Sequence, residues 1–354
     1  MTKIKSGGLE RPEDKSDISD LCSPLGARKR PKARRGQRRK DTAEYYDFAT
    51  AILGIEVFES LDEDPFDDWS ARDCARLTRA ATAARKKLVS HASAHFLRQH
   101  RHSFFQIILV DSIARFIRWD RAGAVVSSRF MYAREPELLT GFFWRFAHLD
   151  GAQQGWDPTA SPATRKEADL FTRVFQQFLN DMEAGTKDGR LIRKLPNADE
   201  TQDGSGGYPT WKIHVANEAV GKTTDLLVRR PHAGERSFIG RATRGYVAYD
   251  LQDERFVFLK DSWRRKEADG PSEFDMYQEL YRNHVPFVPD ILYGGDVRNA
   301  DGEPQQTLND LVPEGGISKG YVHNRIVQDI YYRLSSAQTE RELVQAVHDV
   351  FVGK

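Results

Sequence analysis

The chain has 354 residues, a formal net charge of +1 at pH 7 and 39% hydrophobic residues. This composition is typical of globular proteins. Roughly 150 residues make up an average domain, so this length predicts two domains. No apolar run approaches the roughly 18 residues of a membrane-spanning helix, and the N-terminus MTKIKSGGLERPEDK lacks the apolar core of a signal peptide. We expect an intracellular protein, cytoplasmic or nuclear, without a membrane partner. Cys22 and Cys74 are then reduced thiols, and their spacing predicts no structural zinc.

Residues 1–40 form a basic tail. The stretch from Arg28 to Lys40 (RKRPKARRGQRRK) contains nine lysines or arginines and no acidic residue. The tail is also nearly devoid of large apolar residues, which predicts disorder. Such a run serves nuclear import or binds nucleic acid through its phosphates, or it is a solvated tail without a specific partner. Both interpretations stay open.

Residues 41–205 are expected to form an accessory α+β domain. Apolar residues recur every three or four positions from Cys74 through Leu77 to Phe96, which predicts one amphipathic helix over residues 73–99. The predicted strands cover residues 104–110, 114–119 and 124–127, as an antiparallel meander. Two more helices are predicted over residues 135–148 and 166–182. Their aromatic stripes, which include Phe143 and Phe146, are interpreted as core.

A stretch without periodicity, ADETQDGSGGY at residues 198–208, separates this domain from a second one over residues 206–354. Strands are predicted there at residues 211–215, 224–228, 288–293 and 321–328, together with a hairpin and a helix over residues 272–282. A final helix opens at Thr339, whose spacing from Glu342 is that of a capping box. Its stripe of Leu343, Val344, Val347 and Phe351 is expected to be buried.

The hairpin lies within GRATRGYVAYDLQDERFVFLKDSW, residues 240–263. Gly240, Gly245 and Val247 fit three of the four fixed positions of G-x-G-x-x-G-x-V, a loop whose glycines let backbone N–H groups approach phosphate oxygens. Lys260 closes the next strand, and Glu273 lies on the following helix. An ion pair between such a lysine and glutamate holds a phosphate-binding lysine extended. This order of elements is that of a protein-kinase N-lobe.

Several stretches resemble the fungal-type protein kinase family. They include HRHSFFQIILVDSIARFIRWDRAGAVVSSRF, QGWDPT, the glycine-containing stretch, VPFVPDILYGGD and YVHNRIV, and the resemblance covers most of residues 45–354. It implies an accessory domain followed by a eukaryotic-type kinase domain, with ATP and Mg²⁺ as cofactors and Ser/Thr substrates. It also implies that Gly240, Gly245, Val247, Lys260 and Glu273 contact or position the nucleotide.

The chain departs from that pattern in two ways. A kinase needs an H-R-D…N catalytic loop and a D-F-G magnesium motif, and neither occurs in the 354 residues, where His100 to His102 reads HRH. Phe258 also stands where the family pattern has a small residue over the adenine. We therefore expect a truncated kinase-like chain without catalytic residues or Mg²⁺ ligands of its own, inactive as a transferase, or alternatively a non-enzymatic interaction module.

Other interpretations of these residues stay open. Gly240 and Gly245 also suit a plain turn and bulge, while Lys260 and Glu273 also suit a solvated surface. The spacing of His91 and His95 permits metal binding, but no acidic ligand follows nearby, and a buried helix face is favoured. Gly221, Lys222 and Thr223 resemble only the end of a phosphate-binding Walker loop, and the sequence before them argues against one.

Overall fold

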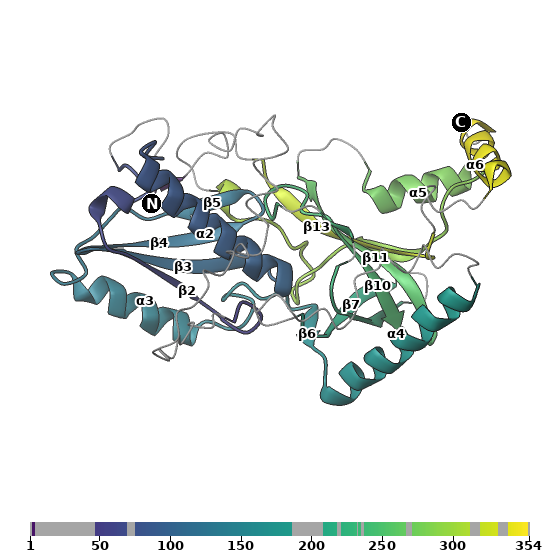
Figure 1. Cartoon of the computed structure of the whole chain (residues 1–354), viewed down its shortest axis with the longest axis horizontal. Helices are drawn as coiled ribbons and strands as arrows, with labels where there is room; N and C mark the ends of the chain where they lie inside the picture. The colour runs from purple at the N-terminus through teal and green to yellow at the C-terminus, as the bar shows by residue number, and fades with distance from the viewer. Residues whose placement is uncertain are drawn as a thin grey trace, which may run out of the picture.

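The computed structural model contains two β-sheets that lie next to each other along the longest axis of the molecule (Figure 1). It describes residues 2–3, 47–68, 75–185, 208–217, 221–231, 233–234, 237–266, 271–311, 319–331 and 339–352. The first sheet has the order β1-β5-β4-β3-β2. The second has the order β12-β13-β11-β10-β8-β7-β6, with β9 beside β10. This is the α+β fold class that the sequence predicts.

The elements of the first part of the chain are β1 (Thr2–Lys3), β2 (Gly54–Phe58), η2 (Leu61–Glu63), α2 (Arg79–Arg98), β3 (Ser103–Val110), β4 (Ile113–Asp120), β5 (Gly123–Val126) and α3 (Pro136–His148). Strand β1 pairs with β5, although the sequence predicts disorder there. The rest of the basic tail, including Arg28 to Lys40, lies outside the described residues, as do Cys22 and Cys74.

The later elements are β6 (Ala160–Pro162), α4 (Arg165–Gly185), β7 (Trp211–Asn217), β8 (Lys222–Val228), β9 (Ala233–Gly234), β10 (Arg244–Asp250), β11 (Arg255–Arg265), α5 (Glu273–Arg282), β12 (Ile291–Asp296), η5 (Asn309–Leu311), β13 (Tyr321–Gln328) and α6 (Glu340–Val352). In the described part of the chain, every helix is too short or too polar to span a bilayer.

Strands β3, β4 and β5 form the predicted antiparallel meander, with Phe104 opposite Trp119. The turn into β5 is stabilised by Asp120, whose side chain accepts a hydrogen bond from the Ala122 backbone N–H at 2.7 Å. Strand β2, which the sequence did not predict, runs parallel to β3 at the edge of the sheet. Helix α2 covers one face of this sheet, and α3 covers the other (Figure 1).

Helix α2 begins later than predicted, at Arg79 instead of residue 73. The Thr78 side chain caps it by accepting a backbone N–H of the first turn at 3.2 Å. Before the cap, Ala75 forms an isolated β-bridge with Phe66. The apolar period that predicted an earlier start runs through Leu77, whose side chain is 84% exposed. The cap therefore sets the start of the helix, and the apolar spacing does not.

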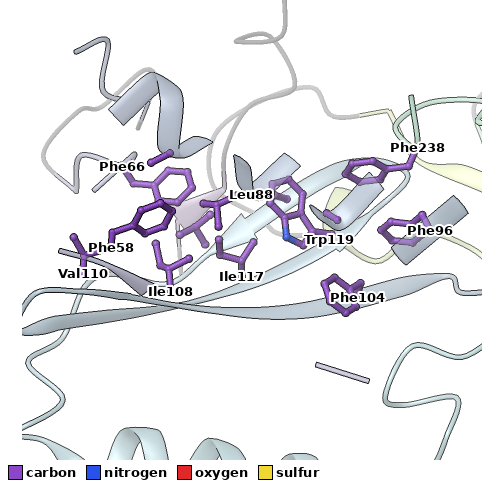
Figure 2. Close-up of a cluster of buried hydrophobic side chains, with 14 of the residues drawn as sticks. Phe58, Phe66, Leu88, Phe96, Phe104, Ile108, Val110, Ile117, Trp119 and Phe238 are labelled. Carbon is purple, nitrogen blue, oxygen red and sulfur yellow. The ribbon is translucent and has the colours of Figure 1, made fainter. Parts of the chain in front are cut away.

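The core of the first sheet lies between the strands and α2. Figure 2 shows its aromatic and aliphatic side chains together: Phe58, Phe66, Leu88, Phe96, Phe104, Ile108, Val110, Ile117, Trp119 and Phe238. Phe238 comes from the segment just before β10. Its ring stacks on Phe96 at a centroid distance of 4.8 Å and meets Trp119 edge-on at 5.8 Å. The second part of the chain thus completes the core of the first.

Strands β10 and β11 form the predicted hairpin, with Gly245 opposite Lys260 and Val247 opposite Phe258. β11 also pairs with β13, and the sheet curls until β12 approaches β7. The curled sheet encloses an apolar cluster: Trp211, Ile213, Val215, Leu226, Val228, Tyr246, Ala248, Val257, Leu259, Tyr293 and Val327. Strand β11, which carries Lys260, is therefore paired with β10 on one side and with β13 on the other.

Strand β12 begins and ends three residues later than the predicted range 288–293, and its two glycines continue the pairing with β13. Gly294 has a φ of +147°, and a Cβ atom at this position would lie 2.3 Å from the carbonyl oxygen of Arg325. Gly295 has a similar φ of +138°, but a Cβ there would meet open space. The close approach of the two strands thus requires a glycine at position 294.

Two helices share the outer face of the second sheet. Phe256, Phe258 and Lys260 alternate along β11 and therefore point to this face. Helix α4 covers the end with the hairpin turn, where the Phe178 ring lies 4.5 Å from Phe256. Helix α5 covers the end with Lys260. α4 precedes the predicted domain boundary, of which residues 198–207 lie outside the described residues, and the division into domains stays a prediction.

Of two apolar stripes that the sequence assigned to a core, one is partly exposed and the other is exposed. On α3, Phe146 is buried, but Phe143 is not, and neighbouring Trp144 is 64% exposed. On α6, Leu343, Val344 and Val347 are all exposed, so the prediction of a buried stripe is wrong. Periodicity shows that a helix has an apolar face, but it does not show what packs against that face.

Candidate functional site

A pocket of about 350 Å³ opens on the outer face of the second sheet, between β11 and α5. Its lining residues are Arg241, Lys260, Ser262, Arg264, Pro271, Glu273, Met276, Tyr277, Leu280 and Asn324. β11 supplies the side chains at alternate positions 260, 262 and 264, which all point to one face. α5 supplies the opposite wall through Glu273 and residues three, four and seven positions later, which share one helical face.

Lys260 and Glu273 form the ion pair that the sequence predicts. The Lys260 ammonium donates to both carboxylate oxygens of Glu273, at 2.5 and 2.7 Å. Glu273 is the first residue of α5, where the capping box of Ser272 and Asp275 fixes the start of the helix. Both side chains of the pair are about three-quarters buried. The lysine is consequently held extended across the floor of the pocket.

A second cation of the wall is already paired. The Arg264 guanidinium donates to Asp296 on β12, at 2.8 Å from Nε. Asn324 on β13 donates to the same carboxylate at 3.2 Å. These contacts hold Arg264 at the wall of the pocket with its charge paired to Asp296.

Arg241 is the third cation, and the sequence analysis did not single it out. Its side chain is 61% exposed, and its Nη2 atom lies 3.9 Å from a carboxylate oxygen of Glu273. That distance is too long for a hydrogen bond. The guanidinium therefore stays available to a ligand.

The predicted glycine positions have different environments. Gly240 has a φ of +87°, which favours glycine, and its backbone N–H donates to the carbonyl oxygen of Arg121 at 2.8 Å. Ala242, at the middle glycine position, also has a positive φ of +40°. Gly245 is an ordinary strand residue between β9 and β11. None of these three positions lines the pocket described above.

The loop before β10 is tied to its surroundings. The Arg121 guanidinium donates to the carbonyl oxygen of Phe238 at 3.0 Å, which complements the bond from Gly240. On the other side, the backbone N–H of Trp263 donates to the carbonyl oxygen of Arg241 at 2.8 Å. The loop is therefore fixed by Arg121 of the first sheet and by Trp263 of the second sheet.

Val247 lies away from the lysine. Its side chain is 8% exposed and belongs to the apolar cluster that Phe171 and Phe175 of α4 form on the outer face of the sheet. Phe256 contacts the same two rings at 6.4 and 5.8 Å. The structure thus brings Lys260 and Glu273 together and places Val247 under α4.

A buried ionic network lies behind Lys260, on the inner face of the sheet. Asp261 accepts hydrogen bonds from Arg244 and Arg325, each at 3.3 Å, and contacts His323 at 2.9 Å. Arg325 also pairs with Asp157, which precedes β6. The network joins strands β10, β11 and β13 to a segment from the first part of the chain. None of these side chains was a predicted site residue.

Charge pairing keeps the two carboxylates ionised. Burial alone would raise the pKa of Asp261, but Arg244 and His323 hold that pKa well below its usual range. Arg325 has the same effect on the pKa of Asp157. Burial lowers the pKa of His323, while the neighbouring Asp261 opposes that shift. Two buried arginines therefore balance two buried aspartates.

The comparison with protein families gives the decisive observation. The family model described as fungal protein kinase matches residues 72–314, more than half of the chain. The chain belongs to the fungal protein kinase family. The match extends from the segment before α2 to just beyond η5, so it includes strands β3 to β12 and every pocket-lining residue except Asn324, whereas β1, β2 and β13 lie outside it. Searches of curated proteins and of solved structures gave no significant match.

The fungal protein kinase family implies ATP and Mg²⁺, and the pocket fits the two differently. Lys260 and Arg241 suit phosphate oxygens, because both are cations at the wall of an open pocket. A magnesium ion needs oxygen ligands, but the one carboxylate among the lining residues, Glu273, accepts from Lys260 with both oxygens. No group of three potential metal ligands occurs among the described residues, which include His91 and His95.

Proposed function

We propose that the pocket between β11 and α5 binds the phosphates of ATP, as the nucleotide-binding part of a protein kinase-like fold. The ion pair of Lys260 with both oxygens of Glu273 is the observation that carries the proposal. A lysine held in this way presents its ammonium to α and β phosphates at a fixed place. Membership of the fungal protein kinase family also supports a kinase-like function in general terms.

In this proposal, Gly240 and Gly245 act through the shape of the loop. Gly240 allows the positive φ that turns the chain toward β10, and Gly245 leaves the position opposite Lys260 without a side chain. Val247 supports the hairpin from below α4. The nucleotide would thus meet a fixed loop, whose bond from Gly240 to Arg121 is already formed.

We further propose that these 354 residues bind nucleotide without transferring phosphate. The sequence contains neither an H-R-D…N loop nor a D-F-G motif. Without such groups, no residue is assigned as the base for the substrate hydroxyl or as a Mg²⁺ ligand. Lys260 and Glu273 would then bind and position the nucleotide, and a second set of residues would be required for chemistry.

Thermal unfolding with and without ATP tests the proposal. ATP at about 100 times its Kd stabilises a protein by about 2.7 kcal/mol and raises Tm by several degrees. This shift should disappear in Lys260→Ala and shrink in Glu273→Gln. Lys319→Ala, which removes an exposed lysine elsewhere, is the matched control. A shift that persists unchanged in Lys260→Ala would show that ATP binds elsewhere.

A radiolabel assay in the same samples tests the absence of transfer. We expect no labelled protein product above background with γ-labelled ATP and a generic Ser/Thr substrate. Transfer that is abolished by Lys260→Ala would contradict this expectation, while leaving nucleotide binding in place.

A non-enzymatic interaction module is the second candidate. It is favoured by the exposed apolar side chains of α3 and α6, because exposed patches of this kind mark contact surfaces. Trp144 and Val344 are 64% and 66% exposed. Absence of any ATP-dependent shift in the wild-type chain would favour this function over nucleotide binding.

A further inference from the structure

The pocket has an excess of positive charge. Arg241, Lys260 and Arg264 line it, against Glu273 as the carboxylate among the lining residues. Lys260 is committed to Glu273 and Arg264 to Asp296, whereas Arg241 remains beyond hydrogen-bond distance of Glu273. A bound anion would therefore gain most from Arg241, whose planar guanidinium can contact two phosphate oxygens at once.

The backbone of the loop offers less to a phosphate than its sequence suggests. The N–H of Gly240 is used by the Arg121 carbonyl, and the loop is fixed from the other side by the bond from Trp263 to Arg241. Ala242 adds a Cβ atom at the position of the middle glycine, and the residue is buried. The Arg241 side chain thus takes the place of backbone N–H groups as the anion-binding element of the loop.

Among the residues that the structure describes, few groups around the pocket could recognise a base. Toward the hairpin turn, the outer face is covered by α4, which packs on Val247 and Phe256. The α5 wall presents Met276, Leu280 and the ring of Tyr277, which is mainly a packing surface. The polar groups opposite it are Ser262 and Asn324, and the Asn324 amide already donates to Asp296. Strong discrimination between two similar ligands requires such partners. The pocket is also at the small end of the roughly 300–1,000 Å³ that ligand pockets span.

We propose that this pocket recognises the triphosphate chain through Arg241 and Lys260 and does not distinguish the nucleobase. The inference rests on the proposed function of phosphate binding and specifies its ligand class: nucleoside triphosphates of any base, and inorganic tripolyphosphate. Within the loop before β10, Arg241 is the residue whose side chain binds phosphate.

Calorimetric titration of the full chain with ATP, GTP, tripolyphosphate and adenosine tests this inference. The three triphosphates should bind within about threefold of one another, and adenosine should not bind detectably. Arg241→Gln should weaken all three by about tenfold, as expected for the loss of a charge-assisted contact. Arg241→Lys should give a smaller loss, because lysine keeps the charge without the planar fork.

Two controls separate specific binding from attraction to charge. Arg265→Gln removes an exposed arginine of the same strand whose side chain points to the opposite face, and it should retain wild-type affinity. The basic stretch from Arg28 to Lys40 attracts any polyanion. The titrations are therefore done at physiological salt, and only the part of the binding that is lost in Lys260→Ala is assigned to the pocket.

The outcomes distinguish this inference from the function on which it rests. Binding of adenosine, or ATP binding more than about threefold tighter than GTP, would overturn base-independent recognition while supporting nucleotide binding. Unchanged triphosphate affinity in Arg241→Gln would overturn the role of Arg241. If no triphosphate binds in a Lys260-dependent manner, the proposed function itself fails.

Discussion

Arg121 and Gly240 form one of two hydrogen bonds by which Arg121 joins the first sheet to the loop before β10. The Gly240 backbone N–H donates to the Arg121 carbonyl oxygen at 2.8 Å, and the Arg121 guanidinium donates to the Phe238 carbonyl oxygen at 3.0 Å. Arg121 is buried, stacked against Phe96, and burial lowers its pKa to about 9. The loop beside the pocket is thus part of the packing between the two sheets.

Removal of the Phe238 ring should destabilise the first sheet as well as the loop. Because Phe238 is buried against Phe96 and Trp119, we expect Phe238→Ala to lower the free energy of unfolding by about 3–5 kcal/mol. Urea titration followed by tryptophan fluorescence measures this loss. Phe287→Ala removes a 61% exposed ring and should change stability by less than about 0.5 kcal/mol. Equal values for the two variants would contradict the packing role of Phe238.

Asp261 should be essential to the stability of the buried network. Asp261→Asn removes the negative charge between Arg244 and Arg325, and breaking such a buried pair costs about 3–5 kcal/mol. Asp253→Asn makes the same change at an exposed position in the hairpin turn, where the cost should be small. Thermal unfolding of the two variants at pH 7 gives the comparison. A Tm of Asp261→Asn equal to that of Asp253→Asn would show that the network is not stabilising.

Stability should fall as the pH drops below about 6.5. Burial lowers the pKa of His95 to about 3, whereas an unfolded histidine has a pKa of about 6.5. Between these values the unfolded chain binds a proton that the folded chain does not, which costs about 1.4 kcal/mol per pH unit. Burial also lowers the pKa of His100 and of His323, so both act in the same direction.

Denaturant unfolding at pH 7, 6 and 5 measures that slope. His95→Gln should reduce it by about 1.4 kcal/mol per pH unit. His148→Gln, on the exposed side of α3, is the matched control. If His95→Gln and the wild type lose stability in parallel, protonation of His95 is not a source of the acid sensitivity.

The two glycines of β12 should differ in their tolerance of alanine. Both have a φ in a region that is essentially restricted to glycine, so each alanine costs about 1–3 kcal/mol for the backbone conformation. At position 294, the new Cβ atom also meets the Arg325 carbonyl oxygen at 2.3 Å, and relieving such overpacking costs about 1–3 kcal/mol more. Gly294→Ala should therefore unfold at a clearly lower urea concentration than Gly295→Ala. Equal midpoints would argue against the close strand approach.

Local signals in the sequence predicted much of the fold. Strand β13 matches its predicted range, and α5 begins at the Ser272 cap. The pair of Lys260 and Glu273 could be predicted because its members occur in a fixed order along strand and helix. These features depend on periodicity, capping and motif order, which are written in neighbouring residues.

Other features depend on contacts between distant parts of the chain. Nothing in the spacing around Phe238 indicates that its ring enters the core of the first sheet. The apolar face of α4 was predicted, but its packing on the second sheet near Val247 was not. Arg241 was missed because an exposed arginine in a loop has no periodic signal. Tertiary packing decided each of these cases.

The position of Phe238 also constrains how this protein can change by recombination. A crossover that joined the second sheet to an unrelated N-terminal region would leave the Phe238 ring without Phe96 and Trp119. The same crossover would remove the carbonyl oxygen of Arg121 that receives the Gly240 N–H. The first sheet with α2 and the second sheet with the Phe238 segment are therefore expected to be inherited together and not exchanged separately.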